Sequence, residues 1–429
     1  MSLWQSLNMD RRALLRRFRH SRSWVPDDLR AVTRIAGDEE EPSAGGMTRS
    51  DVEAIWSKTE RLFRHGLHPL VSLCLRRKGR VVLHRTLGWS HGGGPGSPKE
   101  ALRTVATPET PVCMFSASKA ITAMVVHLLD EDGLLHVDDR VADYIPEFAQ
   151  NGKGWMTLRH LLSHRAGIPS TGGRGDVELL TDWDGIVRLL CEAEPISRPG
   201  HKLSYHALTG GFVLGEVVRR VTGMDVRTVL GQRILQPLGI ARLNYGVSEG
   251  DVPLVAENHF TGIPVFPPFS GVANFVLGMS FEEAARLSNE PKFLTAIVPS
   301  GNIVGTAEEM SRFFQMLLDG GVWNGERIFE ERTVRRATQQ TSFRELDLSL
   351  LLPLRYGLGF MLGGKFISPF GPNTQAAFGH LGLMNIHCWA DRWRDTSVSL
   401  VTSGKPLVSD HLLSLFQLLS TITARTPRA

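Results

Sequence analysis

Strand-like segments lie near both ends of the chain and helical patterns fill its middle, and this distribution limits the folds open to it. Segments 70–76 and 80–87 are rich in Val and Leu around the turn Arg77-Lys78-Gly79, so they predict an antiparallel hairpin. Further strand-like segments occur late in the chain, at 356–362, 376–379, 385–390 and 397–402. We therefore expect an α+β protein in which both chain ends build one antiparallel sheet.

Helical periodicity dominates the part between the two groups of strands. Apolar residues recur at helical spacing in segments 120–129, 158–163, 184–191, 208–221, 226–235, 281–287 and 308–318. A capping-box pattern, Ser50-Asp51-Val52-Glu53, predicts a helix before the hairpin, and 411–422 predicts a final amphipathic helix. We expect helices to flank the sheet, with a mostly helical domain inserted between its two halves. The sheet part covers about 46–115 and 350–425, and the helical part about 116–349.

Residues 1–45 differ from the rest of the chain in charge. The net charge is +4, and residues 10–34 contribute +5 from eight Arg and three Asp, so the remainder is close to neutral. Arginines alternate with Leu and Phe there, which predicts an amphipathic helix that makes weak contact with a membrane surface. The alternative is a solvated extension. An acidic, Gly-bearing segment at 38–46 predicts a linker to the body of the protein, 46–425.

Composition and spacing exclude several classes of protein. A hydrophobic content of 42% with 21% charged residues is typical of a globular protein with a large core. No apolar run reaches the length of a spanning helix and no secretory signal pattern opens the chain, so we expect a cytoplasmic protein. The basicity is local, and we expect no nucleic-acid partner. The oligomeric state is left open by the sequence.

Cysteine and histidine spacing gives no sign of a metal or cofactor. Four widely spaced cysteines contain no Cys-x-x-Cys pair, which favours buried reduced thiols over zinc or disulfides. His160 and His164 have the spacing of two metal ligands on a helix, but the Glu of a His-Glu-x-x-His motif is absent. A structural role is preferred for both, and we predict neither a metal nor a cofactor.

The segment Phe115-Ser116-Ala117-Ser118-Lys119 carries the first candidate for chemistry. Residues three apart on a helix share a face, so the amine of Lys119 can reach the hydroxyl of Ser116. A serine hydroxyl becomes a good nucleophile when a neighbouring group accepts its proton, and a desolvated lysine can be that group. The start of the following helix also favours a developing negative charge. The bland alternative is a serine that only caps the helix.

A second serine motif, Gly88-Trp89-Ser90-His91-Gly92, matches the Gly-x-Ser-x-Gly pattern of a nucleophile elbow. That elbow requires a strand, a turn and a helix, whereas a Gly- and Pro-rich loop follows here. We therefore predict that Ser90 is not the nucleophile. Two further segments hold polar residues at turns, Pro199-Gly200 leading to Tyr205, and His380-Leu381-Gly382. Alone, each is equally compatible with packing.

Together these segments resemble the serine beta-lactamase-like superfamily, which includes class C beta-lactamases, D-alanyl-D-alanine peptidases and lactamase-like carboxylesterases. The resemblance covers roughly residues 50–422 in family order. The matching motifs are Phe115 to Lys119, Asp138-Asp139-Arg140-Val141, Tyr144 to Phe148, Thr157 to Ile168, Pro199-Gly200 with Tyr205 and Gly215, Gly305 to Met310, Tyr356 to Phe360, and His380-Leu381-Gly382. The resemblance implies a beta-lactamase/transpeptidase-like fold.

By the same resemblance, Ser116 is the nucleophile, Lys119 assists its deprotonation and Tyr205 is a general base. A phenol acts as a base at neutral pH only when its pKa falls from ~10 to about 7. We expect an adjacent ammonium group to supply that effect. His380 and Gly382 occupy the position of the family's Lys-Thr-Gly motif, and the backbone N–H groups of Ser116 and Leu383 would form the oxyanion hole.

Two departures from the family pattern bear on the substrate. The asparagine of the Tyr-x-Asn motif is Ala207 here, and the lysine of Lys-Thr-Gly is His380. An ester has no amide N–H to position, so both losses favour ester substrates over beta-lactams or peptides. A Pro-rich loop with Ile263, Val265, Phe266 and Phe269 is a candidate acyl pocket, or simply part of the core.

We therefore predict a serine carboxylesterase acting on a small-molecule ester. The alternatives are a beta-lactamase or D-amino-acid peptidase with the same nucleophile, and a non-catalytic scaffold or interaction protein on the same fold.

Overall fold

The computed structural model describes residues 21–172, 175–267, 269–343, 345–383 and 385–428. The predicted basic helix of the N-terminal extension lies almost entirely outside the described residues. Within the described ranges, no helix is long and apolar enough to cross a membrane. The cytoplasmic location and the membrane contact stay predictions. All four cysteines are buried and unpaired.

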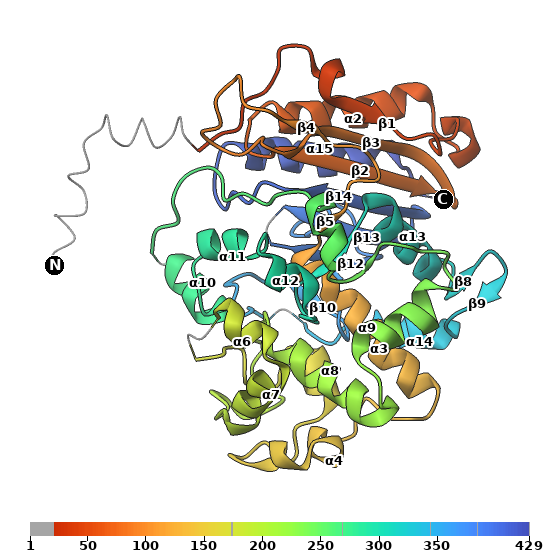
Figure 1. The fold of residues 1–429 in the computed structure, drawn as a ribbon. Coiled ribbons are helices and arrows are strands. Elements are labelled where there is room, and N and C mark those ends of the chain that lie inside the picture. The colour runs from red at the N-terminus through yellow and green to blue at the C-terminus, as the bar shows by residue number, and fades with distance from the viewer. Residues whose placement is uncertain (1–20, 173–174, 268, 344, 384, 429) are drawn as a thin grey trace.

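One large antiparallel sheet forms the upper half of the molecule (Figure 1). Its strand order is β1-β3-β2-β14-β13-β12-β11-β10, with β4 paired to β3. The bounds are β1 Thr33–Ile35, β2 Leu70–Arg77, β3 Arg80–His91, β4 Thr104–Val105, β10 Arg355–Tyr356, β11 Met361–Leu362, β12 Ala377–Gly382, β13 Ile386–Asp391 and β14 Thr396–Thr402. Because β2 pairs with β14, the two ends of the chain meet in the middle of the sheet, as predicted.

Helices cover both faces of this sheet. Helices α2 (Arg49–Phe63) and α15 (His411–Arg425) pack together on one face, and α13 (Ala307–Leu318) covers the other (Figure 1). Strand side chains alternate between the two. The thiol of Cys74 contacts the hydroxyl of Ser311 in α13, whereas the Arg85 guanidinium lies over the Trp56 ring of α2. The sheet is therefore buried on both sides.

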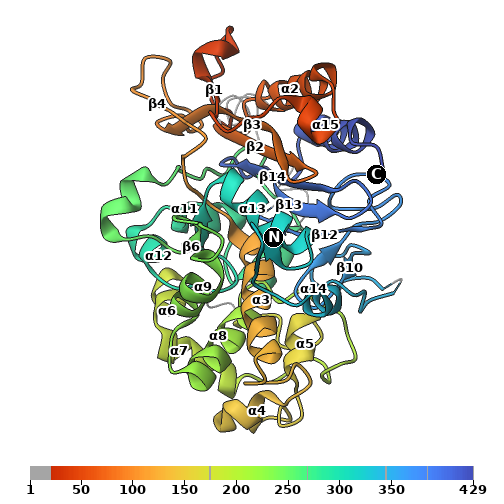
Figure 2. The ribbon, with the colours of Figure 1, turned by 90° about the vertical axis from the view of Figure 1, so that its right-hand side faces the viewer.

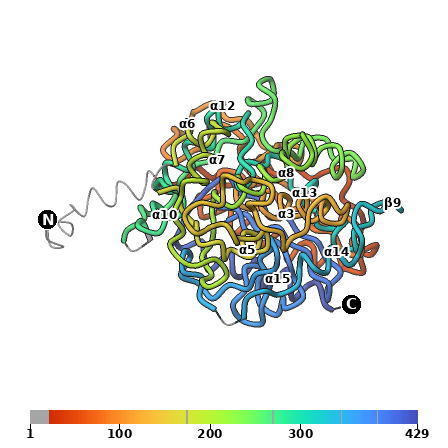
Figure 3. Tube along the Cα trace, turned by 90° about the horizontal axis from the view of Figure 1, so that it is seen from below, coloured from red at the N-terminus to blue at the C-terminus, as the bar shows by residue number. Residues whose placement is uncertain are grey.

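The helical part lies below the sheet in Figure 1 and surrounds α3 (Ser118–Glu131), whose first twelve residues are buried. Helix α3 contacts α8 (Thr209–Thr222), α9 (Val226–Leu230) and α14 (Glu331–Ala337) (Figure 3). The other helices are α4 Val141–Tyr144, α5 Leu158–Leu162, α6 Val177–Thr181, α7 Trp183–Glu192, α10 Phe269–Leu277, α11 Phe281–Leu287 and α12 Pro291–Thr295. Small sheets join β5 Val112–Cys113, β7 Ile303–Gly305 and β6 Asn244–Tyr245, and separately β8 Val322–Trp323 and β9 Glu326–Arg327.

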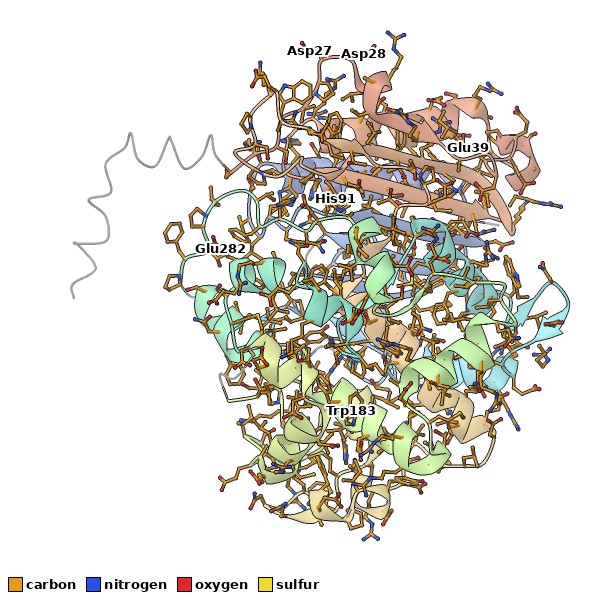
Figure 4. All side chains as sticks on the ribbon, in the orientation of Figure 1. Asp27, Asp28, Glu39, His91, Trp183 and Glu282 are labelled. Carbon is orange, nitrogen blue, oxygen red and sulfur yellow. The ribbon has the colours of Figure 1, made fainter. Side chains whose placement is uncertain are left out.

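The acidic segment predicted as a linker instead packs on the sheet. Strand β1 pairs with β3 just before this segment. The carboxylate of Glu39, labelled in Figure 4, accepts hydrogen bonds of 2.6 and 3.0 Å from the Arg85 guanidinium, and the Asp38 carboxylate accepts one of 2.7 Å from His84. Sequence reasoning missed this because the partners lie over forty residues away. Residues 29–45 are thus an integral part of the body.

Two local predictions also need correction. The capping residue of α2 is Thr48 rather than Ser50, because the Thr48 hydroxyl accepts the Asp51 N–H and the Asp51 carboxylate accepts the Thr48 N–H. The predicted strand 356–362 is broken into β10 and β11 by a turn at Gly359, where φ is +95°. A Cβ at Gly359 would lie 2.1 Å from the Cβ of Ala123, so the close approach of α3 dictates the turn.

Candidate active site

Ser116 lies in a tight 3₁₀ turn (Phe115–Ala117) between β5 and α3. Phe115 has a φ of +47°, a left-handed conformation that is costly for a large side chain. Three hydrogen bonds hold the turn: Met114 N–H to the carbonyl of Ile303 (2.7 Å), Ile303 N–H to the Ser118 hydroxyl (3.1 Å), and that hydroxyl to the carbonyl of Phe115 (2.5 Å). The turn leaves the Ser116 side chain half-buried beside the start of α3.

The Lys119 amine has three polar neighbours. Its Nζ lies 3.1 Å from the Ser116 Oγ, and it donates to the carbonyls of Ala207 (2.6 Å) and Ser300 (3.0 Å). Within the described part of the chain no carboxylate pairs with it, and burial holds the pKa of Lys119 well below its usual value. A neutral amine has two N–H groups and one lone pair. Two carbonyls can take the N–H groups, which leaves the lone pair for the Ser116 hydroxyl.

Tyr205 is buried next to this pair. Its phenol forms a hydrogen bond with Ser116, and the Lys119 Nζ lies 4.9 Å from the centre of its ring. The expected lowering of the Tyr205 pKa is wrong. Burial raises this pKa well above the ordinary value, and the hydrogen bond to Ser116 offsets only part of the rise. With its pKa raised in this way, Tyr205 keeps its proton near neutral pH.

Asp347 fixes Tyr205 from behind and was not anticipated. Its fully buried carboxylate accepts the backbone N–H of Tyr205 (3.1 Å) and the hydroxyl of Tyr356 (2.8 Å). The ring of His164 packs between the two tyrosines, with its centre 4.7 Å from the ring centre of Tyr205 and 5.1 Å from that of Tyr356. The only sign of this residue's role in the sequence is an aspartate placed between two leucines. It pointed to no partner because the contact spans 142 residues.

His380 in β12 faces the same site, with its ring centre 6.1 Å from that of Tyr205. Its Nδ1–H donates to the carbonyl of Leu381 (2.7 Å), which leaves the buried Nε2 as an acceptor without a described partner. Burial, with the nearby Lys119, lowers the pKa of His380 to about 3. This imidazole is therefore neutral, unlike the lysine of the family motif.

Gly382 brings the end of β12 against the turn that holds Ser116. A Cβ at Gly382 would lie 2.1 Å from the carbonyl oxygen of Met114, so only glycine permits this approach. The next residue, Leu383, lines the same cavity as Ser116. This arrangement agrees with the predicted use of the Ser116 and Leu383 N–H groups, and their role as an oxyanion hole stays a prediction.

An apolar cavity of about 50 Å³ opens beside Ser116. It is lined mainly by Phe115, Leu180, Ala207, Leu208, Leu277, Met279, Ala284, Leu287, Phe293 and Leu383. The predicted acyl pocket of Ile263, Val265 and Phe266 does not contribute to it, and Phe266 is 55% exposed. The side chain of Phe269 lies outside the described residues. Helices α6, α10, α11 and α12 thus supply apolar surface that we had assigned to the loop before α10.

Of the remaining sequence candidates, only His164 contacts this site. Ser90 is in β3 rather than at a strand-to-helix turn, which supports its rejection as a nucleophile. His160 accepts the backbone N–H of Thr157 at the start of α5, whereas His164 packs on Tyr205. No group of three metal-binding side chains occurs within the residues that the structure describes.

Comparisons with known proteins agree with this geometry. A family model described as Beta-lactamase matches residues 59–420. The protein called Esterase/beta-lactamase LipL, from Mycobacterium tuberculosis, is 32% identical over 319 residues, which cover 70% of this chain and 71% of LipL. A penicillin-binding protein homologue from Caulobacter crescentus matches with a TM-score of 0.75 at 27% identity, covering 89% of this chain and 99% of that one. A family VIII carboxylesterase matches with a TM-score of 0.72 at 25% identity, over 87% of this chain and 98% of that one. The chain belongs to the beta-lactamase family.

Proposed function

We propose that this protein is a serine hydrolase, and more narrowly a carboxylesterase that forms an acyl-enzyme on Ser116. The carrying observation is the 3.1 Å contact between the Lys119 Nζ and the Ser116 Oγ, in a place where burial holds the pKa of the amine well below its usual value. A neutral amine at hydrogen-bond distance is the base that a serine nucleophile requires. The relatives named for esterase activity support the same assignment.

Acylation begins when the Ser116 oxygen attacks the ester carbonyl and its proton passes to the lone pair of Lys119. The carbonyl oxygen becomes an oxyanion, which the N–H groups of Ser116 and Leu383 would stabilise. The C–O bond to the alcohol then breaks. The leaving oxygen takes the proton back from the Lys119 ammonium, and the acyl group stays on Ser116.

Deacylation repeats these steps with water. A water molecule gives a proton to Lys119 as it attacks the acyl carbon, and the Ser116 oxygen recovers that proton when the acid leaves. Tyr205 remains a phenol throughout, since its pKa is raised. It acts as a hydrogen-bond donor that steadies the reacting oxygen, in place of the general base that the sequence suggested.

The surroundings of Ser116 favour esters over amides. Ala207 offers a backbone carbonyl to Lys119 but no side-chain amide for a substrate N–H. His380 is neutral, so a substrate carboxylate would meet no charge there. An ester needs neither contact, and its alcohol is a better leaving group than an amine.

The proposal is tested with p-nitrophenyl acetate and butyrate, with the beta-lactam nitrocefin as the competing substrate. We expect ester turnover that Ser116→Ala abolishes, while Ser90→Ala, the matched control, leaves it intact. Labelling with a fluorophosphonate, followed by mass spectrometry, should place the modification on Ser116. Fast nitrocefin turnover without ester turnover would favour the lactamase or peptidase alternative. No turnover and no labelling would favour a non-catalytic scaffold.

A further inference from the structure

An inverted pattern of side chains runs along residues 345–352, here called the leucine loop, between α14 and β10. Asp347 and Ser349 are 0% and 2% exposed, whereas Leu346 and Leu348 are 49% and 48% exposed. Residues 348–351 form a turn that the Asp347–Leu352 bridge closes, and soluble proteins normally bury leucines. Here the polar side chains face inward and the leucines face solvent.

The inner side of the leucine loop is bonded to the active-site segment 203–205. Asp347 accepts the Tyr205 N–H, the Ser349 hydroxyl lies 2.7 Å from that of Ser204, and the Leu348 N–H donates to the carbonyl of Leu203 (3.0 Å). The polar residues are therefore needed inside. The leucine loop therefore packs directly against the segment that carries Tyr205, and its exposed leucines lie on the opposite side of the loop from that segment.

Further exposed apolar side chains lie near the outer side of the leucine loop. Leu351 and Leu352 are 45% and 51% exposed, and Leu351 has a φ of +57°, a costly conformation for a leucine. Strand β10, which follows, is the edge of the sheet (Figure 2) and pairs with β11, so the loop after β11 starts at the same end. That loop exposes Phe366 and Ile367 by 79% and 64%. Exposed apolar side chains that gather at one end of a sheet edge favour contact with an apolar partner.

Positive charges that are unpaired within the described residues flank this apolar surface. Lys202, next to Leu203, and Lys365, next to Phe366, are exposed and form no ion pair with any described residue. The one acid at the start of the leucine loop, Glu345, is paired with Arg165 at 2.6 Å. Exposed leucines flanked by lysines without a carboxylate partner among the described residues are complementary to a lipid surface that carries negative charge.

We propose that the leucine loop docks on an anionic lipid surface and that the active site takes its ester from that surface. This inference rests on the proposed esterase function for its second half only. Docking brings the lipid surface next to Tyr205, while the cavity beside Ser116 receives the short acyl group of an ester dissolved in that surface.

Binding is tested with the full-length Ser116→Ala protein, which cannot turn over an ester, by co-sedimentation with phosphatidylglycerol or phosphatidylcholine vesicles. We expect binding to the anionic vesicles, weakened about tenfold by the double change Leu346→Ser and Leu348→Ser, because half-exposed leucines lose apolar contact. Leu413→Ser is the matched control: this residue of α15 is 62% exposed and should not matter. Equal binding to both vesicles, or binding that the double variant retains, would overturn the proposal.

Activity provides a separate readout. The double variant should hydrolyse dissolved p-nitrophenyl acetate at the wild-type rate, but an ester dispersed in phosphatidylglycerol vesicles about tenfold more slowly. An equal loss on both substrates would mean that the leucines only support the fold, and would refute docking. Absence of all ester turnover would refute the proposed function, while vesicle binding by Ser116→Ala would still decide the docking. Self-association that the double variant loses, without vesicle binding, would make a second copy the partner instead.

Discussion

The cavity beside Ser116 limits the length of the acyl group. Its volume of about 50 Å³ holds roughly four water-sized groups, at about 10–15 Å³ for each. Each buried methylene contributes about 0.8 kcal/mol, which is roughly a fourfold gain in kcat/KM. We therefore expect kcat/KM for p-nitrophenyl esters to rise about fourfold per carbon from acetate to butyrate. It should then fall at hexanoate and octanoate, which no longer fit.

Leu287→Ala tests the assignment of this cavity. Leu287 is 5% exposed and lines the cavity, so shortening it should move the best substrate by about two carbons, at a cost of about 2–5 kcal/mol of stability. Leu294→Ala is the control, since Leu294 is equally buried, in α12, but does not line the cavity. The assay is initial-rate kinetics over the ester series, with thermal denaturation of both variants. A wild-type profile that rises steadily to octanoate, or the same shift in Leu294→Ala, would refute the reasoning.

Further predictions concern the charges of the site. Lys119→Arg should lower kcat with p-nitrophenyl acetate by about 10³-fold or more, with circular dichroism unchanged, because a guanidinium cannot accept the serine proton. In the wild-type protein the neutral amine is the active form, so kcat/KM should fall as the pH drops through the lowered Lys119 pKa; a midpoint near 10 in a pH–rate profile would contradict this. Asp347→Ala should lower kcat more than it raises KM, because the backbone N–H of Tyr205 loses its acceptor. His380→Lys should raise nitrocefin turnover relative to ester turnover by about tenfold or more. Deleting residues 1–45 should lower the Tm, because β1 and the Glu39 ion pair are lost with them.

Short-range rules predicted much of this structure from the sequence. The hairpin of β2 and β3, the bounds of α11 and the approach of Lys119 to Ser116 all depend on residues close in the chain. The strands at both ends also predicted the shared sheet, because each group alone would leave apolar faces uncovered.

Contacts between distant segments account for what the sequence could not predict. The partners of Lys119 include two main-chain carbonyls, and no side-chain pattern reports a carbonyl. Similarly, the direction of the Tyr205 pKa depends on how deeply the fold buries it and on whether its neighbour keeps a charge. The sequence did not single out Asp347, and it predicted the acidic segment 38–46 as a linker, because the partners of both lie far away in the chain.

Electrostatics, more than shape, separates the substrates that this site can favour. Burial lowers the pKa of both Lys119 and His380, and the His380 imidazole, with a pKa of about 3, is neutral where the family motif has a lysine. A substrate carboxylate would leave water and gain no cation, which forgoes a charge-assisted hydrogen bond of about 1.5–3 kcal/mol. An uncharged ester loses nothing in the same place, and its acyl group gains the apolar cavity. We therefore expect the replacement of a lysine by His380 to shift the preference toward uncharged substrates, while Lys119 stays 3.1 Å from the Ser116 Oγ.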